Sequence, residues 1–113
     1  MNIELDLTIA EALFRGNSLD IDCHINQSLE DCTINAELFD MFYSSIKLSS
    51  VVETEIEILD EEDGTFIIHI DKNLTNNFHL VSYLEIDLTD ADGKTQTIWF
   101  SPIKFVDNIY LRA

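Results

Sequence analysis

Hydrophobic and polar residues alternate with a period of two along most of this 113-residue chain. Successive side chains of a β-strand point to opposite faces of a sheet, so the alternation predicts strands that have one buried and one solvated face. In residues 18–26, for example, hydrophobic side chains occupy the odd positions and polar ones the even positions. Seven segments share this pattern and are predicted as strands: 2–9, 18–26, 32–39, 51–59, 65–71, 80–89 and 94–106.

Turn signals separate these segments. Asp63-Gly64 and Asp92-Gly93 are strong turn dipeptides, because glycine adopts positive φ angles without steric cost. Pro102 falls within the last segment and has no backbone N–H to donate to a neighbouring strand. We therefore expect that segment to be an edge strand or to break at the proline.

The last two segments are predicted to pair as a hairpin around the second Asp-Gly turn. Leu84 and Leu88 share one face of the first strand. On the returning strand, a strict period of two places Ile98 and Phe100 on one face and Trp99 on the other. We therefore expect Ile98 and Phe100 to point the same way, opposite to Trp99.

A segment near the N-terminus does not show a clear alternation. Residues 8–16 carry a capping-box pattern, with Thr8 and Glu11 three positions apart, and Gly16 suits the position after a helix. A short helical turn near residues 8–15 and an irregular strand are both compatible with this sequence.

Strands with one polar face imply two sheets whose hydrophobic faces pack together. We therefore predict an all-β fold, with residues 1–113 forming a single domain, an immunoglobulin-like antiparallel β-sandwich of about seven strands. The antibody signature is absent, since Trp99 follows both Cys23 and Cys32 instead of lying between them.

Acidic residues outnumber basic ones by 22 to 6, which gives a formal net charge of −16. This balance argues against nucleic acid and anionic membranes as partners, because both are bound through lysine and arginine. It is compatible with simple solubility or with a basic partner protein. No hydrophobic run approaches the ~20 residues of a membrane helix, and acids occupy the N-terminal positions where a signal peptide is basic. We therefore expect synthesis in a cytoplasm, without a signal peptide.

The aspartate-rich loop around Asp90 and Asp92 looks like a calcium ligand set but fails the spacing test. In an EF-hand loop aligned on its glycine, the first and twelfth positions supply oxygen ligands. Here those positions hold Leu88 and Trp99, so turn chemistry is the favoured interpretation. The loop at residues 60–64 fails in the same way, and a weak calcium site shared by the two loops is the alternative.

No catalytic, cofactor-binding or metal-ligating residue is predicted. His24, His69 and His79 are far apart in sequence, and the spacing of histidines and cysteines matches no zinc motif. Nucleophile motifs and glycine-rich phosphate loops are also missing. Cys23 and Cys32 fall at hydrophobic positions of their segments and are expected to be buried free thiols. An enzymatic function is therefore not expected.

Two hydrophobic clusters are candidate interaction patches. One follows the third predicted strand and the other lies near residue 113, and an exposed apolar patch often marks a contact with another chain. The alternative is that both clusters complete this domain's own sandwich. The patch residues are Phe39, Phe42, Tyr43, Ile109, Tyr110 and Leu111.

Several motifs occur in an order that resembles a known family. They are RGNSLDIDCHI, INAELFD, DGTFIIHIDKNLT and YLEIDLTDADGKTQTIWFSPIKF, and the likeness covers roughly residues 13–106. The segment is similar to the immunoglobulin-like domains of bacteriophage tail and baseplate proteins, in particular to the N-terminal domain family of phage baseplate upper proteins. The turn at residues 15–18, the segment at 63–75 and the hairpin at 83–97 carry the likeness.

The resemblance implies a non-enzymatic structural or adaptor protein of a phage particle, in the tail, baseplate or neck. Its expected partners are other virion proteins or copies of itself within a homo-oligomeric assembly, with no cofactor, and its expected location is the virion. Domains of that family usually precede receptor-binding modules, and a chain of one domain favours a small structural or adaptor subunit. The alternative is an acidic soluble binding module or inhibitor that engages a basic partner protein.

Overall fold

The fold is described from a computed structural model, which places residues 4–9, 13–14, 18–40, 45–71 and 81–106. Nine strands and no helix are present in these residues, so the all-β prediction is confirmed. The strands are β1 (Leu5–Ile9), β2 (Leu13–Phe14), β3 (Leu19–Ile25), β4 (Thr33–Phe39), β5 (Ser45–Ser49), β6 (Ile56–Asp60), β7 (Thr65–Ile70), β8 (Val81–Thr89) and β9 (Thr95–Val106).

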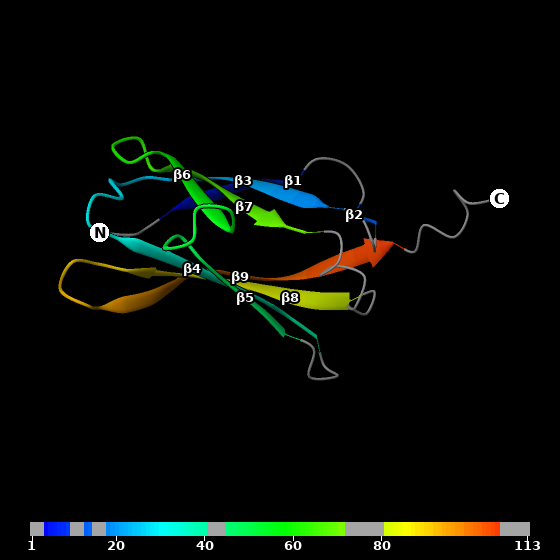
Figure 1. The fold of residues 1–113 in the computed structure, drawn as a ribbon. Helices are drawn as coiled ribbons and strands as arrows, with labels where there is room; N and C mark the ends of the chain where they lie inside the picture. The colour runs from blue at the N-terminus through cyan, green and yellow to red at the C-terminus, as the bar shows by residue number, and fades with distance from the viewer. Residues whose placement is uncertain (1–3, 10–12, 15–17, 41–44, 72–80, 107–113) are drawn as a thin grey trace.

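The strands form two sheets that pack face to face (Figure 1). The four-stranded sheet has the order β1-β3-β7-β6, and the five-stranded sheet has the order β2-β9-β8-β4-β5. Neighbouring strands run antiparallel except β2, which pairs parallel with the end of β9. This strand order matches that of an immunoglobulin domain. Strands A, B, E and D of that fold correspond to β1, β3, β7 and β6, and strands G, F and C correspond to β9, β8 and β4. The predicted sandwich is therefore confirmed.

The two strands absent from the prediction, β2 and β5, are short and lie at sheet edges. β5 pairs with β4 from Asn35↔Ser49 to Phe39↔Ser45. The predicted strand at residues 51–59 begins only at Ile56, because the preceding residues form a turn closed by backbone hydrogen bonds such as Glu55 N to Val52 O, 2.9 Å. β2 has two residues and β5 fully buries one side chain, Leu48, so neither carries a long alternation.

The helical alternative for residues 8–16 is wrong where the structure describes this segment. Thr8 and Ile9 belong to β1, and Leu13 and Phe14 form β2, while residues 10–12 and 15–17 lie outside the described residues. The backbone groups of these strands bond to β3 in one sheet and to β9 in the other. Pairing with distant strands therefore outweighs the local capping pattern.

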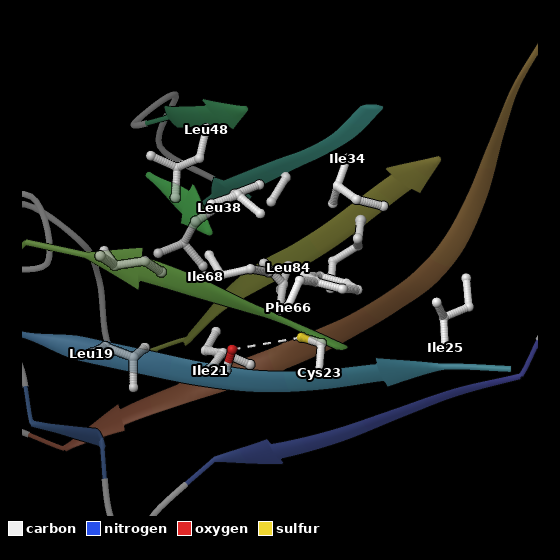
Figure 2. Close-up of a cluster of buried hydrophobic side chains, with 14 of the residues drawn as sticks. Leu19, Ile21, Cys23, Ile25, Ile34, Leu38, Leu48, Phe66, Ile68 and Leu84 are labelled. Atoms are coloured by element: carbon white, nitrogen blue, oxygen red, sulfur yellow. Dashed lines mark hydrogen bonds between the residues drawn. The ribbon is translucent and has the colours of Figure 1, made fainter. Parts of the chain in front are cut away.

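The hydrophobic core lies between the two sheets and follows the predicted alternation. In β3 and β4, every second residue is buried. Ile21 and Phe66 of the four-stranded sheet belong to one buried cluster with Ile34 and Leu84 of the five-stranded sheet, and all four are at most 1% exposed (Figure 2). Each side chain of this size contributes about 1.5–3 kcal/mol through burial.

Both cysteines are free thiols, but only one is fully buried. Cys23 lies in the core with its Sγ 3.7 Å from the carbonyl oxygen of Ile21, and burial, with a smaller effect of the Asp22 charge, raises its pKa to about 12 (Figure 2). Cys32 is half-buried. The expectation of burial therefore holds for Cys23 and is wrong for Cys32, which follows the turn between β3 and β4 at the rim of the core.

A β-bulge in β9 changes which side chains face the core. Trp99 pairs with Ile86, but Thr97 pairs with the next residue of β8, so Ile98 is an extra residue on β9. One inserted residue reverses the inward and outward order of a strand. Trp99 therefore packs against the core, while Phe100 points outward and is 57% exposed. The expectation that Ile98 and Phe100 share a face opposite to Trp99 is wrong for this reason.

The proline in β9 does not end the strand. Pro102 stands opposite Tyr83 of β8, and β9 continues to Val106. Among the described residues, β2 pairs only with the last two residues of β9. Most of β9 is therefore an edge strand, as the missing N–H of the proline predicts.

Gly64 joins the turn between β6 and β7 to the end of β3. Its φ angle is +79°, its N–H donates to the carbonyl of Asp60 at 2.9 Å, and its own carbonyl accepts from the N–H of Ile25 at 2.9 Å. A Cβ atom at this position would overlap the carbonyl oxygens of Ile25 and Gln27. Gly93 also has a positive φ angle, +83°, but nothing lies within 4 Å of its would-be Cβ.

Replacing Gly64 by alanine is therefore expected to destabilise the protein far more than replacing Gly93. Each substitution forces alanine into the left-handed region at a cost of about 1–2 kcal/mol. Gly64→Ala adds a backbone overlap, and its total loss should reach about 3 kcal/mol or more. Urea unfolding of both variants measures the two free energies of unfolding. Equal losses would show that the close approach at Gly64 is unimportant.

Candidate functional site

Three aromatic side chains form a cluster on the outer face of the five-stranded sheet. Phe39 ends β4, Tyr83 lies on β8 and Phe100 on β9. The ring centroids of Phe39 and Tyr83 are 5.7 Å apart, those of Tyr83 and Phe100 are 5.8 Å apart, and those of Phe39 and Phe100 are 6.2 Å apart. Such distances are typical of interacting rings. We call Phe39, Tyr83 and Phe100 the aromatic cluster.

Each ring faces outward for a local reason. Leu38 and Leu84 are buried, so the adjacent Phe39 and Tyr83 lie on the opposite face of the sheet. Phe39 and Tyr83 are also direct partners in the pairing of β4 with β8. Phe100 reaches the same face only through the bulge in β9. The aromatic cluster thus combines two positions set by alternation with one set by an inserted residue.

Three carboxylates border the aromatic cluster, and we call Glu37, Glu85 and Asp87 the carboxylate row. Glu37 and Glu85 are direct partners across β4 and β8, and Phe100 stands opposite Glu85 on β9. Burial raises the pKa of Glu85, and a hydrogen bond with Asp87 and the charges of Asp87 and Glu37 raise it further. The Oδ1 atom of Asp87 is buried and has no hydrogen-bond partner in the described structure. This face therefore carries more negative charge than its own contacts neutralise.

A depression with a volume of about 220 Å³ lies beside the carboxylate row. Its polar lining comes from Asn35 and Glu37 of β4, Lys47 of β5 and Asp87 of β8. The carboxylate of Glu37 accepts a hydrogen bond of 2.7 Å from the hydroxyl of Ser45. The depression can take one small charged group, and its two carboxylates, against one lysine, favour a cation.

The electrostatic repulsion within the carboxylate row can be measured with the variant Glu85→Gln. Because the pKa of Glu85 is raised in the folded protein, its ionised form destabilises the fold above that pKa. The variant is therefore expected to gain about 0.2–1 kcal/mol near neutral pH. The gain should vanish in acid, where the wild-type carboxyl is itself protonated.

Thermal unfolding at neutral and acidic pH checks this prediction. Glu62→Gln is the matched control, because Glu62 is exposed in the turn between β6 and β7. A neutral-pH gain no larger for Glu85→Gln than for Glu62→Gln would show that the row is not strained.

On the opposite sheet, His69 of β7 bridges two carboxylates. Its Nδ1 lies 2.8 Å from Oδ1 of Asp20 on β3, and its Nε2 lies 3.2 Å from Oε1 of Glu57 on β6. The hydrogen bond with Asp20 raises the pKa of His69, and the bond with Glu57 and both charges add to the rise, against the lowering effect of burial.

This arrangement also bears on a catalytic role. Ser18, Asp20 and His69 line one depression of about 360 Å³, and these are the residue types of a hydrolase triad. A triad needs the second histidine nitrogen to accept the serine proton. Here that nitrogen lies 3.2 Å from Oε1 of Glu57, and the two carboxylates favour the protonated imidazole over a free general base.

His69→Gln is expected to lower stability in acid and hardly at all in alkali. A histidine whose pKa is raised on folding contributes stability that is complete below its unfolded pKa of about 6.5 and is lost as the pH rises through the folded pKa. For a partly exposed group, the loss should be about 0.5 kcal/mol. Urea unfolding over this pH range measures it. The same loss at every pH would point to packing instead of charge.

The aspartate-rich loops use their carboxylates on their own backbone. Oδ1 of Asp90 accepts hydrogen bonds from the backbone N–H of Asp92 at 2.9 Å and of Lys94 at 3.0 Å. Oδ1 of Asp60 accepts one from the N–H of Asp63 at 3.1 Å. The turn prediction is therefore confirmed for both loops. Within the described ranges, no group of three His, Cys, Asp or Glu side chains is placed to hold a metal ion.

The predicted interaction patch is represented in the described structure by Phe39, which ends β4 and belongs to the aromatic cluster. The prediction misses its partners Tyr83 and Phe100. Tyr83 shares the parity of the acidic residues on its strand, so alternation could have revealed it, whereas Phe100 depends on the bulge. The other predicted patch residues lie outside the described residues: Phe42, Tyr43, Ile109, Tyr110 and Leu111.

No protein-family model matches the chain, and no curated protein matches it at a significant level. No helix in the part of the chain that the structure describes is long and apolar enough to cross a membrane. The two outer faces of the sandwich are therefore the surfaces compared for a functional site. The four-stranded sheet holds His69 between its own carboxylates, whereas the five-stranded sheet exposes rings beside two directly opposed carboxylates and a buried acceptor that has no donor in the described structure. The second face is the candidate functional site.

Proposed function

We propose that this protein is a non-enzymatic structural or adaptor subunit of a phage particle, in its tail, baseplate or neck, which acts through protein–protein contacts. The observation that carries the proposal is the aromatic cluster, whose outermost ring, Phe100, is 57% exposed. Exposed aromatic groups are enriched where proteins bind one another. The resemblance of the sequence motifs to phage tail and baseplate domains supports the particle setting.

The architecture also suits repeated contacts. β9 pairs with β8 along one side, and β2 covers only Phe105 and Val106 on the other side among the described residues. Open strand edges accept a strand from a neighbouring chain, and a symmetric assembly uses the same patch in every copy. Phe100 belongs both to this edge strand and to the aromatic cluster, so one partner can contact both.

An acidic binding module that engages a basic partner protein is the second candidate. The carboxylate row beside the aromatic cluster and the net charge of −16 favour it. The two candidates use the same face and differ in their partners. Binding that depends on charge weakens strongly as salt is added, whereas assembly through the rings should depend little on salt.

Phe100→Ser is expected to prevent assembly while leaving the fold intact. The side chain is mostly exposed, so its loss should cost little stability. The substitution removes the outermost ring of the aromatic cluster and therefore its contact with a partner. Sedimentation velocity at low and high micromolar concentration measures self-association. Mass spectrometry of purified phage particles measures incorporation.

Val51→Ser is the matched control for this experiment. Val51 is 80% exposed. It follows the last residue of β5, Ser49, whereas Phe39 pairs with the first residue of β5, Ser45. This variant is expected to assemble as the wild type does. A wild-type protein that stays monomeric at all concentrations and is missing from purified particles would contradict the proposed function.

A further inference from the structure

Rings and carboxylates occupy neighbouring rows of the outer face of the five-stranded sheet. Phe39 pairs with Tyr83 across β4 and β8, and Glu37 pairs with Glu85 two residues along. Phe100 stands opposite Glu85 on β9. Directly opposed residues have Cβ atoms about 5 Å apart. A side chain that rests on the aromatic cluster is therefore within reach of the carboxylate row.

The carboxylate row keeps an excess of negative charge, because Lys47, the direct partner of Glu37 on β5, is one cation beside three carboxylates. Glu37 and Glu85 oppose each other directly, an unfavourable pairing for two like charges. Lys47 is exposed and lines the same depression, but no ion pair joins it to a carboxylate in the described structure. Oδ1 of Asp87 is a buried acceptor without a donor, and such atoms are ordinarily satisfied. A ligand that brings both positive charge and N–H donors fits this face.

A guanidinium group matches this combination better than any other group found in proteins. It is planar and weakly hydrated, its edge presents several N–H donors to carboxylates, and its aliphatic stem packs on hydrophobic side chains. A lysine ammonium is a compact, strongly hydrated charge with no planar face. A purely hydrophobic partner would cover the rings but would bury the carboxylates without donors.

We propose that the partner of this face is a protein segment that presents an arginine, whose guanidinium enters the depression between Glu37 and Asp87. The aliphatic stem of the arginine and its neighbouring residues then pack on the aromatic cluster. This inference rests on the proposed function, because it names the partner chemistry of the same contact face. The occupant is a protein and not a nucleic acid, since a net charge of −16 repels phosphates.

Binding of this kind is expected to depend on pH. Glu85 faces Glu37 on β4, Asp87 on its own strand and the uncharged Phe100 on β9, with Lys47 beyond Glu37 on β5. Burial and the two acidic neighbours raise the pKa of Glu85, and a bound cation lowers it again. Affinity should therefore fall as the pH drops through the pKa of Glu85 in the free protein, because a protonated carboxyl no longer attracts the cation.

Two synthetic peptides test the proposal: acetylated and amidated SVTRTVS, and the same peptide with citrulline in place of the arginine. Citrulline keeps the shape of arginine without its charge. Each peptide is titrated into the isotope-labelled protein and followed by NMR. The arginine peptide is expected to shift the amide signals of Glu37, Glu85, Asp87 and Phe100. The citrulline peptide should bind roughly tenfold more weakly, because it loses the charge-assisted hydrogen bonds.

Substitutions in the protein identify the residues that cause the preference for the arginine peptide over the citrulline peptide. Asp87→Asn and Glu37→Gln are each expected to reduce the preference for the arginine peptide, and the same spectra show whether each variant is folded. Glu62→Gln removes one charge from the distant turn between β6 and β7 and should keep the preference. Phe100→Ser should weaken both peptides alike, because both rest on the aromatic cluster.

Equal affinity for the two peptides would overturn the arginine assignment. So would the absence of binding by either peptide, or an unchanged preference in both Asp87→Asn and Glu37→Gln. None of these results decides the proposed function. That proposal is tested by whether the Phe100→Ser variant still self-associates and still enters phage particles. If Phe100→Ser assembles normally while the arginine peptide still prefers the wild-type face, the proposed function fails and the arginine site stands.

Discussion

Burial of one face of each sheet is the constraint on which the rest of this molecule depends. Ile21 and Phe66 of one sheet pack against Ile34 and Ile86 of the other, and all four are fully buried. Because side chains alternate along a strand, each core position also fixes its neighbours on the outside. Most acidic residues of the described strands thereby lie on the two outer faces, and Asp40, after the end of β4, is the buried exception among the described residues. The core therefore decides where negative charge accumulates.

The two outer faces differ in how far their negative charge is compensated by neighbouring groups. On the four-stranded sheet, His69 lies between Asp20 and Glu57, and its raised pKa favours the cationic form that offsets both carboxylates. On the five-stranded sheet, Glu37 and Glu85 oppose each other directly, next to exposed rings. The first face supplies a cation to two of its carboxylates, while the second leaves exposed rings beside two opposed carboxylates for another molecule to cover. This difference is the physical reason for locating function on the five-stranded sheet.

Much of this architecture could be predicted because alternation and Asp-Gly turns are local signals. They reveal every long strand and both hairpin turns that the structure describes, and the parity of Tyr83 places it on the polar face. β2 could not be predicted, because its two residues are held by a parallel pairing with β9 at the far end of the chain. Phe100 could not be placed either, because the register shift next to Ile86 reverses the parity of β9. The capping pattern at residues 8–16 gave the wrong alternative for a similar reason, since its backbone bonds come from distant strands.

The sequence by itself determined the all-β class, the residues that are buried in most strands, and the acidic character of the outside. Each of these follows from a period of two or from composition, which are properties of short segments. Only the tertiary structure decided which strands are neighbours, and hence that Phe39, Tyr83 and Phe100 meet beside Glu37 and Glu85. Cross-strand register and the bulge arise from pairing between segments far apart in the chain, and no local pattern encodes that pairing.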